Sequence, residues 1–104
     1  MQKVLTPKER LQLIRKGNEL FNKGDVEKAA RIFVTTAYKD GLIRIGDYYY
    51  FKEKNPIKAL HFYLEADYKK RINEVTEKMA QIIIKWLHED DKKSESSVKI
   101  KVKP

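Results

Sequence analysis

Two stretches of the chain align with each other when one is shifted by 29 or 30 residues, and this repeat constrains the fold more than any other feature. The first stretch reads Leu13-x2-Lys16-Gly17-x2-Leu20, then Ala29-x3-Phe33-x2-Thr36. The second reads Leu42-x2-Ile45-Gly46-x2-Tyr49, then Ala59-x3-Tyr63-x2-Ala66. The glycines are 29 residues apart and the alanines 30, so we predict a second turn that is one residue longer.

Small residues at fixed places in a repeat allow paired helices to approach closely. Gly17 and Gly46 have no side chain beyond hydrogen, and Ala29 and Ala59 have only a methyl group. The larger residues of each stretch would then fill the space between the two helices of a pair. The repeat therefore predicts an all-α fold in which short antiparallel helix hairpins stack on one another.

This pattern resembles the tetratricopeptide repeat, whose signature is W-x2-L-G-x2-Y, then A-x3-F, then P. The resemblance covers roughly Leu11 to Met79, because Ile72-x2-Val75-Thr76-x2-Met79 repeats the first half of the pattern again. The period is shorter than the family's period of about 34 residues. The tryptophan and the closing proline are also missing. The resemblance implies about two repeats, followed by a long C-terminal capping helix.

Capping residues predict where the helices begin. Thr6, Pro7 and Glu9 form a capping-box pattern, while Asp25 and Asn55-Pro56 open later helices. The predicted helix ends are Gly24 for the first helix, Gly41 for the second, Lys52 for the third, a break near 67–70 for the fourth and His88 for the fifth.

The fifth helix carries an apolar stripe that we expect to be buried against the repeats: Ile72, Val75, Met79, Ile82 and Trp86. From Glu89 onward the chain is polar and is expected to be disordered. We therefore predict a helical domain over 1–91 and a disordered lysine-rich tail over 92–104. That tail holds five lysines against one glutamate, which is half of the net charge of +8.

Composition excludes several classes of protein. The chain has no cysteine, and therefore no disulfide or thiolate metal site. No apolar run reaches the roughly 20 residues of a membrane helix, and the first residues do not resemble a signal peptide. We expect a cytoplasmic protein. No catalytic signature, phosphate loop or metal-ligand spacing is present, so we expect a protein that is not an enzyme and needs no cofactor or metal.

The resemblance places a partner-binding groove on the first helix of each hairpin, where family members hold a peptide or a helix. The residues at these positions are Ile14, Asn18, Phe21, Asn22, Ile43, Asp47, Tyr50, Phe51, Asn73 and Glu77. The run of aromatic residues from Tyr48 to Phe51 cannot all face the core, so Tyr49 is assigned to the core and Tyr50 and Phe51 to the groove. The alternative is that Phe21 and Tyr50 only pack against each other and against the long last helix.

Two further surfaces lie on the fifth helix. Ile83, Ile84, Trp86 and Leu87 give its end more apolar area than two repeats can cover, which predicts association with a second copy or a partner. A basic patch consists of Lys69, Lys70, Arg71, Lys78 and Lys85. The sequence favours a non-catalytic protein-interaction module, an adaptor or assembly factor. A nucleic-acid-binding protein that uses the basic patch and the tail is the alternative.

Overall fold

The computed structural model describes residues 4–96, with side chains as far as Glu89. The described residues form helices and no strands, so the chain is all-α, as the repeat predicts. The elements in order are α1 (Pro7–Asn22), α2 (Val26–Thr36), α3 (Lys39–Asp47), η1 (a π-helix, Tyr48–Lys52), α4 (Pro56–Glu65) and α5 (Lys69–Ser96). The chain divides into two compact units, residues 1–72 and 73–104, which are described separately.

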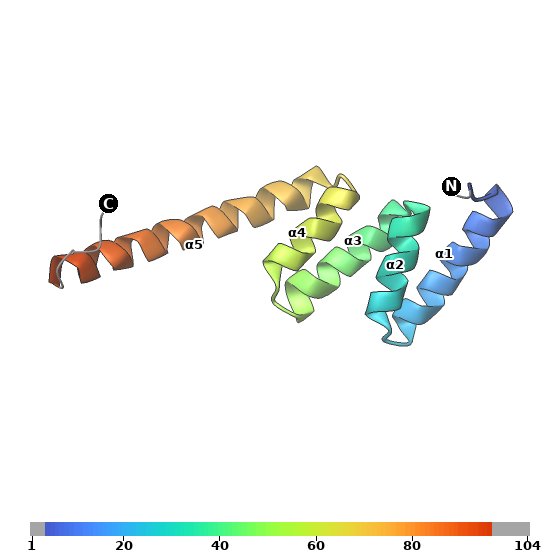
Figure 1. The fold of residues 1–104 in the computed structure, drawn as a ribbon, viewed down its shortest axis with the longest axis horizontal. Helices are drawn as coiled ribbons and strands as arrows, with labels where there is room; N and C mark the ends of the chain where they lie inside the picture. The colour runs from blue at the N-terminus through green and yellow to red at the C-terminus, as the bar shows by residue number, and fades with distance from the viewer. Residues whose placement is uncertain (1–3, 97–104) are drawn as a thin grey trace. The chain divides into compact units, whose positions relative to one another are not determined.

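The first unit consists of two helical hairpins. Helix α1 packs against α2, α3 packs against α4, and α2 joins the hairpins by packing against α3 (Figure 1). The core contains the repeated positions of the sequence: Ala29, Phe33, Leu42, Ile45, Ala59 and Tyr63 are all 1% exposed or less. The first turn of α5 also belongs to this unit.

The two glycines of the repeat lie against the two repeated aromatic rings. A Cβ atom on Gly17 would lie 2.6 Å from the ring of Phe33, and one on Gly46 would lie 2.5 Å from the ring of Tyr63. Both distances are far below van der Waals contact. Each hairpin is therefore held at a separation that only glycine permits in its first helix.

The predicted caps are confirmed. Thr6 accepts a hydrogen bond from the Glu9 amide, and the Glu9 carboxylate accepts one from the Thr6 amide, which completes the capping box of α1. The side chains of Asp25 and Asn55 cap α2 and α4 by accepting a hydrogen bond from the Lys28 and Lys58 amides, and Pro56 is the first residue of α4. Gly24 follows α1 with a φ of +94°, the left-handed conformation that glycine favours.

The prediction that the second helix ends at Gly41 is wrong. Helix α2 ends at Thr36, and Ala37 adopts a left-handed φ of 52°. Gly41 lies inside α3, where a Cβ atom would be 2.6 Å from the ring of Phe33. Glycine is needed here for close packing rather than for chain termination, and the sequence pattern alone does not separate these two uses.

The predicted longer second turn is also wrong, because the extra residue lies in a helix. The turn before α2 consists of Lys23, Gly24 and Asp25, and the turn before α4 consists of Glu53, Lys54 and Asn55, with the middle residue left-handed in both. The additional residue is accommodated by η1, in which the Glu53 amide donates to the Tyr48 carbonyl five residues earlier. The third predicted helix is therefore an α-helix followed by a π-helix.

The second unit, as far as it is described, is the remainder of α5. This helix runs to Ser96, past the predicted end at His88, so residues 92–96 of the predicted disordered tail are helical. Residues 97–104 of that tail lie outside the described residues. Val75 is fully buried, but Ile82 and Trp86 are 44% and 60% exposed, so the prediction that the whole apolar stripe is buried is wrong.

Candidate functional site

One face of the first unit carries side chains from α1 and α3 that contact each other. Arg44 Nη2 on α3 donates a hydrogen bond of 2.7 Å to Asn18 Oδ1 on α1. The same guanidinium lies 5.8 Å from the ring centres of both Phe21 and Phe33. Arg44 therefore joins the two hairpins across this face, and its position is fixed by an amide and two aromatic rings.

Asp47, one helical turn beyond Arg44, is the centre of a second polar cluster. Tyr63 Oη donates a hydrogen bond of 2.6 Å to Asp47 Oδ1, and Arg71 Nε lies 3.7 Å from the same oxygen. Burial, together with the hydrogen bond to Asp47, raises the pKa of Tyr63 above its ordinary value. The phenol therefore stays protonated and acts as a donor. The Asp47 carboxylate binds groups of its own unit, so Asp47 is not a free acidic group for a ligand.

The π-helix separates its aromatic residues between the core and the surface. Tyr49 is buried, as predicted, and its ring stacks on Phe62 with a centroid distance of 5.7 Å and an interplanar angle of 9°. Tyr48 points outward and donates a hydrogen bond of 3.1 Å to Glu53. This hydrogen bond raises the pKa of Tyr48.

The other two aromatic residues of the π-helix border the Asp47 cluster. Tyr50 is half-buried, with its ring edge-on to Phe51 at 4.9 Å and to Tyr63 at 6.4 Å. Phe51 is 52% exposed, and the guanidinium of Arg71 lies 5.1 Å from its ring centre. Phe51 is therefore an exposed aromatic ring whose position is fixed by a half-buried cation and by a second ring.

We name this face the α1–α3 surface; its residues are Asn18, Phe21, Arg44, Asp47, Phe51 and Arg71. Four of these six were predicted for the groove. Arg44 was missed, although its spacing three residues before Asp47 on one helix places both on the same side. Arg71 was assigned to the basic patch, but it lies against Asp47 and Phe51 instead.

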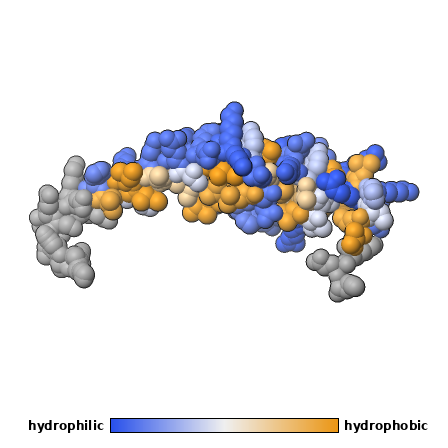
Figure 2. Space-filling view, turned by 90° about the horizontal axis from the view of Figure 1, so that it is seen from above, coloured by the Kyte–Doolittle hydropathy of each residue, from blue (hydrophilic) through white to orange (hydrophobic). Residues whose placement is uncertain are grey.

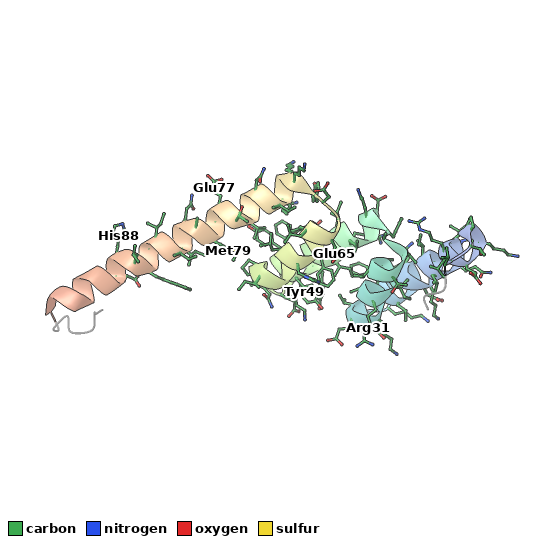
Figure 3. The ribbon with its side chains drawn as sticks, turned by 45° about the horizontal axis from the view of Figure 1, so that its top comes forward. Arg31, Tyr49, Glu65, Glu77, Met79 and His88 are labelled. Carbon is green, nitrogen blue, oxygen red and sulfur yellow. The ribbon has the colours of Figure 1, made fainter. Side chains whose placement is uncertain are left out.

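Five other residues that were predicted for the groove do not belong to the α1–α3 surface. Ile14 is only 7% exposed and belongs to the core, since it lies one turn before the buried Gly17 on α1. Asn22 is exposed at the end of α1, and Ile43 is partly buried beside Arg44. Asn73 and Glu77 are exposed residues of the second unit (Glu77 is labelled in Figure 3).

A cleft that the sequence did not predict lies between α2 and α4. It has a volume of about 580 Å³, and its walls come from α2, η1 and α4, including Arg31 and Tyr49, which Figure 3 labels. The sequence signal that could have indicated it is the second small residue of α2, Ala30, next to the exposed apolar Val34.

The predicted association surface on α5 is exposed. Ile83, Ile84, Trp86 and Leu87 are 53–60% exposed, and Figure 2 shows hydrophobic residues gathered on this part of the helix. Figure 3 shows Glu77 and His88 on one side of the helix and Met79 on the other. The remaining cations of the predicted basic patch are exposed: Lys69, Lys70, Lys78 and Lys85.

The described residues contain neither a candidate metal site nor a helix that could span a membrane. No group of three or more histidine, aspartate or glutamate side chains there could hold a metal ion. None of the described helices is long and apolar enough to cross a membrane.

Comparison with known proteins identifies a relative. An uncharacterized protein of Treponema pallidum (strain Nichols) is 37% identical to this chain over 80 residues, which is 77% of this chain and 76% of the relative. No protein-family profile matches the chain. A comparison with solved structures gives no match.

Proposed function

The chain belongs to the same family as the uncharacterized Treponema pallidum protein, and we propose that it is a non-catalytic protein-interaction module built from two tetratricopeptide-like hairpins. Its partner is a peptide or helix that binds the α1–α3 surface. The proposed role is that of a small adaptor or assembly factor in the cytoplasm. The observation that carries the proposal is the exposed ring of Phe51, which Arg71 and Tyr50 hold in place.

A fixed, half-exposed aromatic residue beside an arginine is the kind of group that contributes most to protein binding. Phe51 loses little conformational freedom on binding, because its contacts already restrict it. The neighbouring Arg44 and Asn18 supply polar contacts at the other end of the surface. A partner would therefore bury an apolar side chain against Phe51 and bind polar groups toward α1.

The test is affinity capture with three versions of the full chain: the parent, Phe51→Ala and Leu64→Ala. Leu64 is a matched control because it is an apolar residue of α4 that is 57% exposed and lies outside the α1–α3 surface. We expect a protein that the parent and Leu64→Ala capture and that Phe51→Ala binds at least about tenfold more weakly, a loss of about 1.4 kcal/mol. Equal capture by all three versions would contradict the role of this surface.

Nucleic-acid binding remains the second candidate, because residues 1–72 carry 16 lysines and arginines against nine aspartates and glutamates. Phosphate contacts weaken steeply as salt is raised. Generic RNA and DNA should be titrated against the full chain and a 1–91 truncation at low and physiological salt. We expect weak binding that is lost at physiological salt. Tight binding by the truncation at physiological salt would favour the nucleic-acid function instead.

The exposed end of α5 supports a further part of the proposal, association with a second copy. Four large apolar residues there are more than half exposed, and large exposed apolar patches usually mark contacts. A symmetric dimer is the simplest assembly that would cover them.

A further inference from the structure

The cleft between α2 and α4 adjoins a second cleft with which it shares three lining residues, and we call the two together the groove. The second cleft has a volume of about 430 Å³ and lies between the turn before α2 and the π-helix. Glu27, Tyr49 and Lys58 line both clefts. The groove therefore follows α2 on one side and η1 with α4 on the other, and all of its lining belongs to the first unit.

The floor of this groove is apolar and well ordered. Tyr49 and Phe62 stack on each other with their rings almost parallel, and both are 8% exposed. Ala30 lines the same cleft from α2 and is only 6% exposed, so the apolar area open to a ligand comes mainly from Val34, which is 40% exposed. An apolar side chain of a ligand would therefore bind against Val34, beside the two rings.

The charged groups of the groove are segregated along its length. Arg31 lines only the α2–α4 end, whereas Asp25 and Glu53 line only the other end. Glu27 and Lys58 line the middle and balance each other. The groove is therefore basic at one end and acidic at the other, with the aromatic floor between them.

Contacts within the unit hold several of these charged groups at the edge of the floor. Lys58 Nζ lies 4.7 Å above the centre of the Tyr49 ring, and the His61 ring lies edge-on to Phe62 at 5.1 Å. At the acidic end, the Glu53 carboxylate accepts a hydrogen bond from the hydroxyl of Tyr48. Asp25 caps α2 and lies 3.7 Å from Lys28, so its charge is partly balanced and Glu53 is the stronger acidic determinant.

We propose that this groove is a second binding site, distinct from the α1–α3 surface, for a linear peptide segment with a polarised charge pattern. The segment carries carboxylates that bind near Arg31, a large apolar side chain against Val34 beside Tyr49 and Phe62, and basic side chains near Glu53. A uniformly acidic or uniformly basic segment would meet like charge at one end of the groove, which is the repulsion that gives such sites their specificity.

The test uses two labelled synthetic peptides of identical composition. The polarised peptide has three glutamates, then Leu-Trp-Leu, then three lysines; in the mixed peptide glutamates and lysines alternate on both sides of the same apolar centre. Fluorescence anisotropy with the full chain should show the polarised peptide binding at least about tenfold more tightly, since each tenfold step is about 1.4 kcal/mol. Equal affinity for the two peptides, or binding of neither, would overturn the proposal.

Charge-reversal variants locate the site. Arg31→Glu and Glu53→Lys should each weaken binding of the polarised peptide, while Lys39→Glu, an exposed cation of α3 outside the groove, should leave it unchanged. The double variant with Arg31→Glu and Glu53→Lys reverses the gradient, so the peptide should bind again with its ends exchanged. Weakening by Lys39→Glu equal to that by Arg31→Glu would show nonspecific attraction and overturn the site.

Because Phe51 does not line the groove, Phe51→Ala should bind the polarised peptide like the parent. This result would show that the groove binds independently of the α1–α3 surface. Either of the two proposed sites can therefore be refuted without refuting the other. Circular dichroism of each variant confirms that the helices remain, and the replaced residues are all exposed.

Discussion

At the scale of single residues, two aromatic rings determine how closely the helices of the first unit approach. Phe33 fills the space against Gly17 and Gly41, and Tyr63 fills the space against Gly46. Tyr63 has a second role, since its hydroxyl donates to Asp47 on the surface. One side chain thus packs the second hairpin and orders the carboxylate at the centre of the α1–α3 surface.

The contact between Gly46 and Tyr63 gives a stability prediction. Gly46→Ala would place a Cβ atom 2.5 Å from a fully buried ring, so either the ring or the helix must shift. Overpacking of this kind costs about 1–3 kcal/mol, even though alanine is the better helix former. Urea denaturation measures the loss. Gln12→Ala, at an exposed position of α1, is the control and should change little; a Gly46→Ala protein as stable as the parent would contradict the close packing.

The raised pKa of Tyr63 predicts a stability change at high pH. In the unfolded chain a tyrosine ionises near pH 10, whereas Tyr63 stays protonated in the folded protein. The contribution of the Tyr63 hydroxyl to the free energy of unfolding is therefore complete below about pH 10. It is lost as the pH rises through the pKa of Tyr63 in the folded protein. Tyr63→Phe, which lacks the hydroxyl, should be less stable than the parent by about 1 kcal/mol at pH 8.

The difference in stability between the parent and Tyr63→Phe should become smaller between pH 9 and pH 11, about one unit either side of the pKa of tyrosine in model peptides. Thermal melts measure it. The other tyrosines are common to both proteins, so the difference isolates Tyr63. A difference that stays constant with pH would show that the hydroxyl does not stay protonated in the folded state.

Residue spacing predicted the core of these hairpins but not the polar contacts of the surface. The core could be predicted because Gly17, Ala29 and their partners repeat at fixed intervals. The hydrogen bonds from Arg44 to Asn18 and from Tyr63 to Asp47 join residues 26 and 16 positions apart. Such contacts depend on how the helices pack, and the sequence pattern does not give the orientation of long polar side chains.

At the scale of elements, the beginnings of the helices with a side-chain cap were easier to predict than the helix ends, whereas α3, which has no such cap, begins at Lys39 and not at the predicted Leu42. Thr6, Asp25 and Asn55 act through local hydrogen bonds to the next few residues, which a short stretch of sequence determines. The end of α2 was missed because Ala37 takes a left-handed conformation that is unusual for alanine. The length of α5 was missed because charged residues can continue a helix as well as form a disordered segment.

Helix α5 gives a prediction about association. Ile84→Lys together with Leu87→Glu removes two exposed apolar side chains without a change in net charge, so the helix should remain folded. If α5 joins two copies, the parent should sediment as a dimer and this variant as a monomer. The control, Gln81→Lys with His88→Glu, changes two exposed polar residues of the same helix and should stay dimeric. A parent that is monomeric at high concentration would exclude the homodimer.

At the scale of the whole molecule, the first compact unit carries most of the net charge. Residues 1–72 carry a net charge of +7, from 16 basic and nine acidic side chains, and they form the first compact unit. Residues 73–91 carry two lysines against five acidic residues, a net charge of −3. The sequence predicted a boundary near residue 91 from the loss of apolar residues, whereas the compact units meet at 72 and 73.

The π-helix gives the second hairpin a position where chain length can change. Loss of one residue within Tyr48–Lys52 would restore the hydrogen bonding of an ordinary α-helical turn, with Gly46 still against Tyr63 and Asn55 still capping α4. Loss of a residue in the middle of α4 would instead rotate all later side chains by about 100° and turn the core residues outward. Natural relatives of this chain should therefore gain or lose single residues at the aromatic run, and an engineered chain should tolerate a shortened hairpin there.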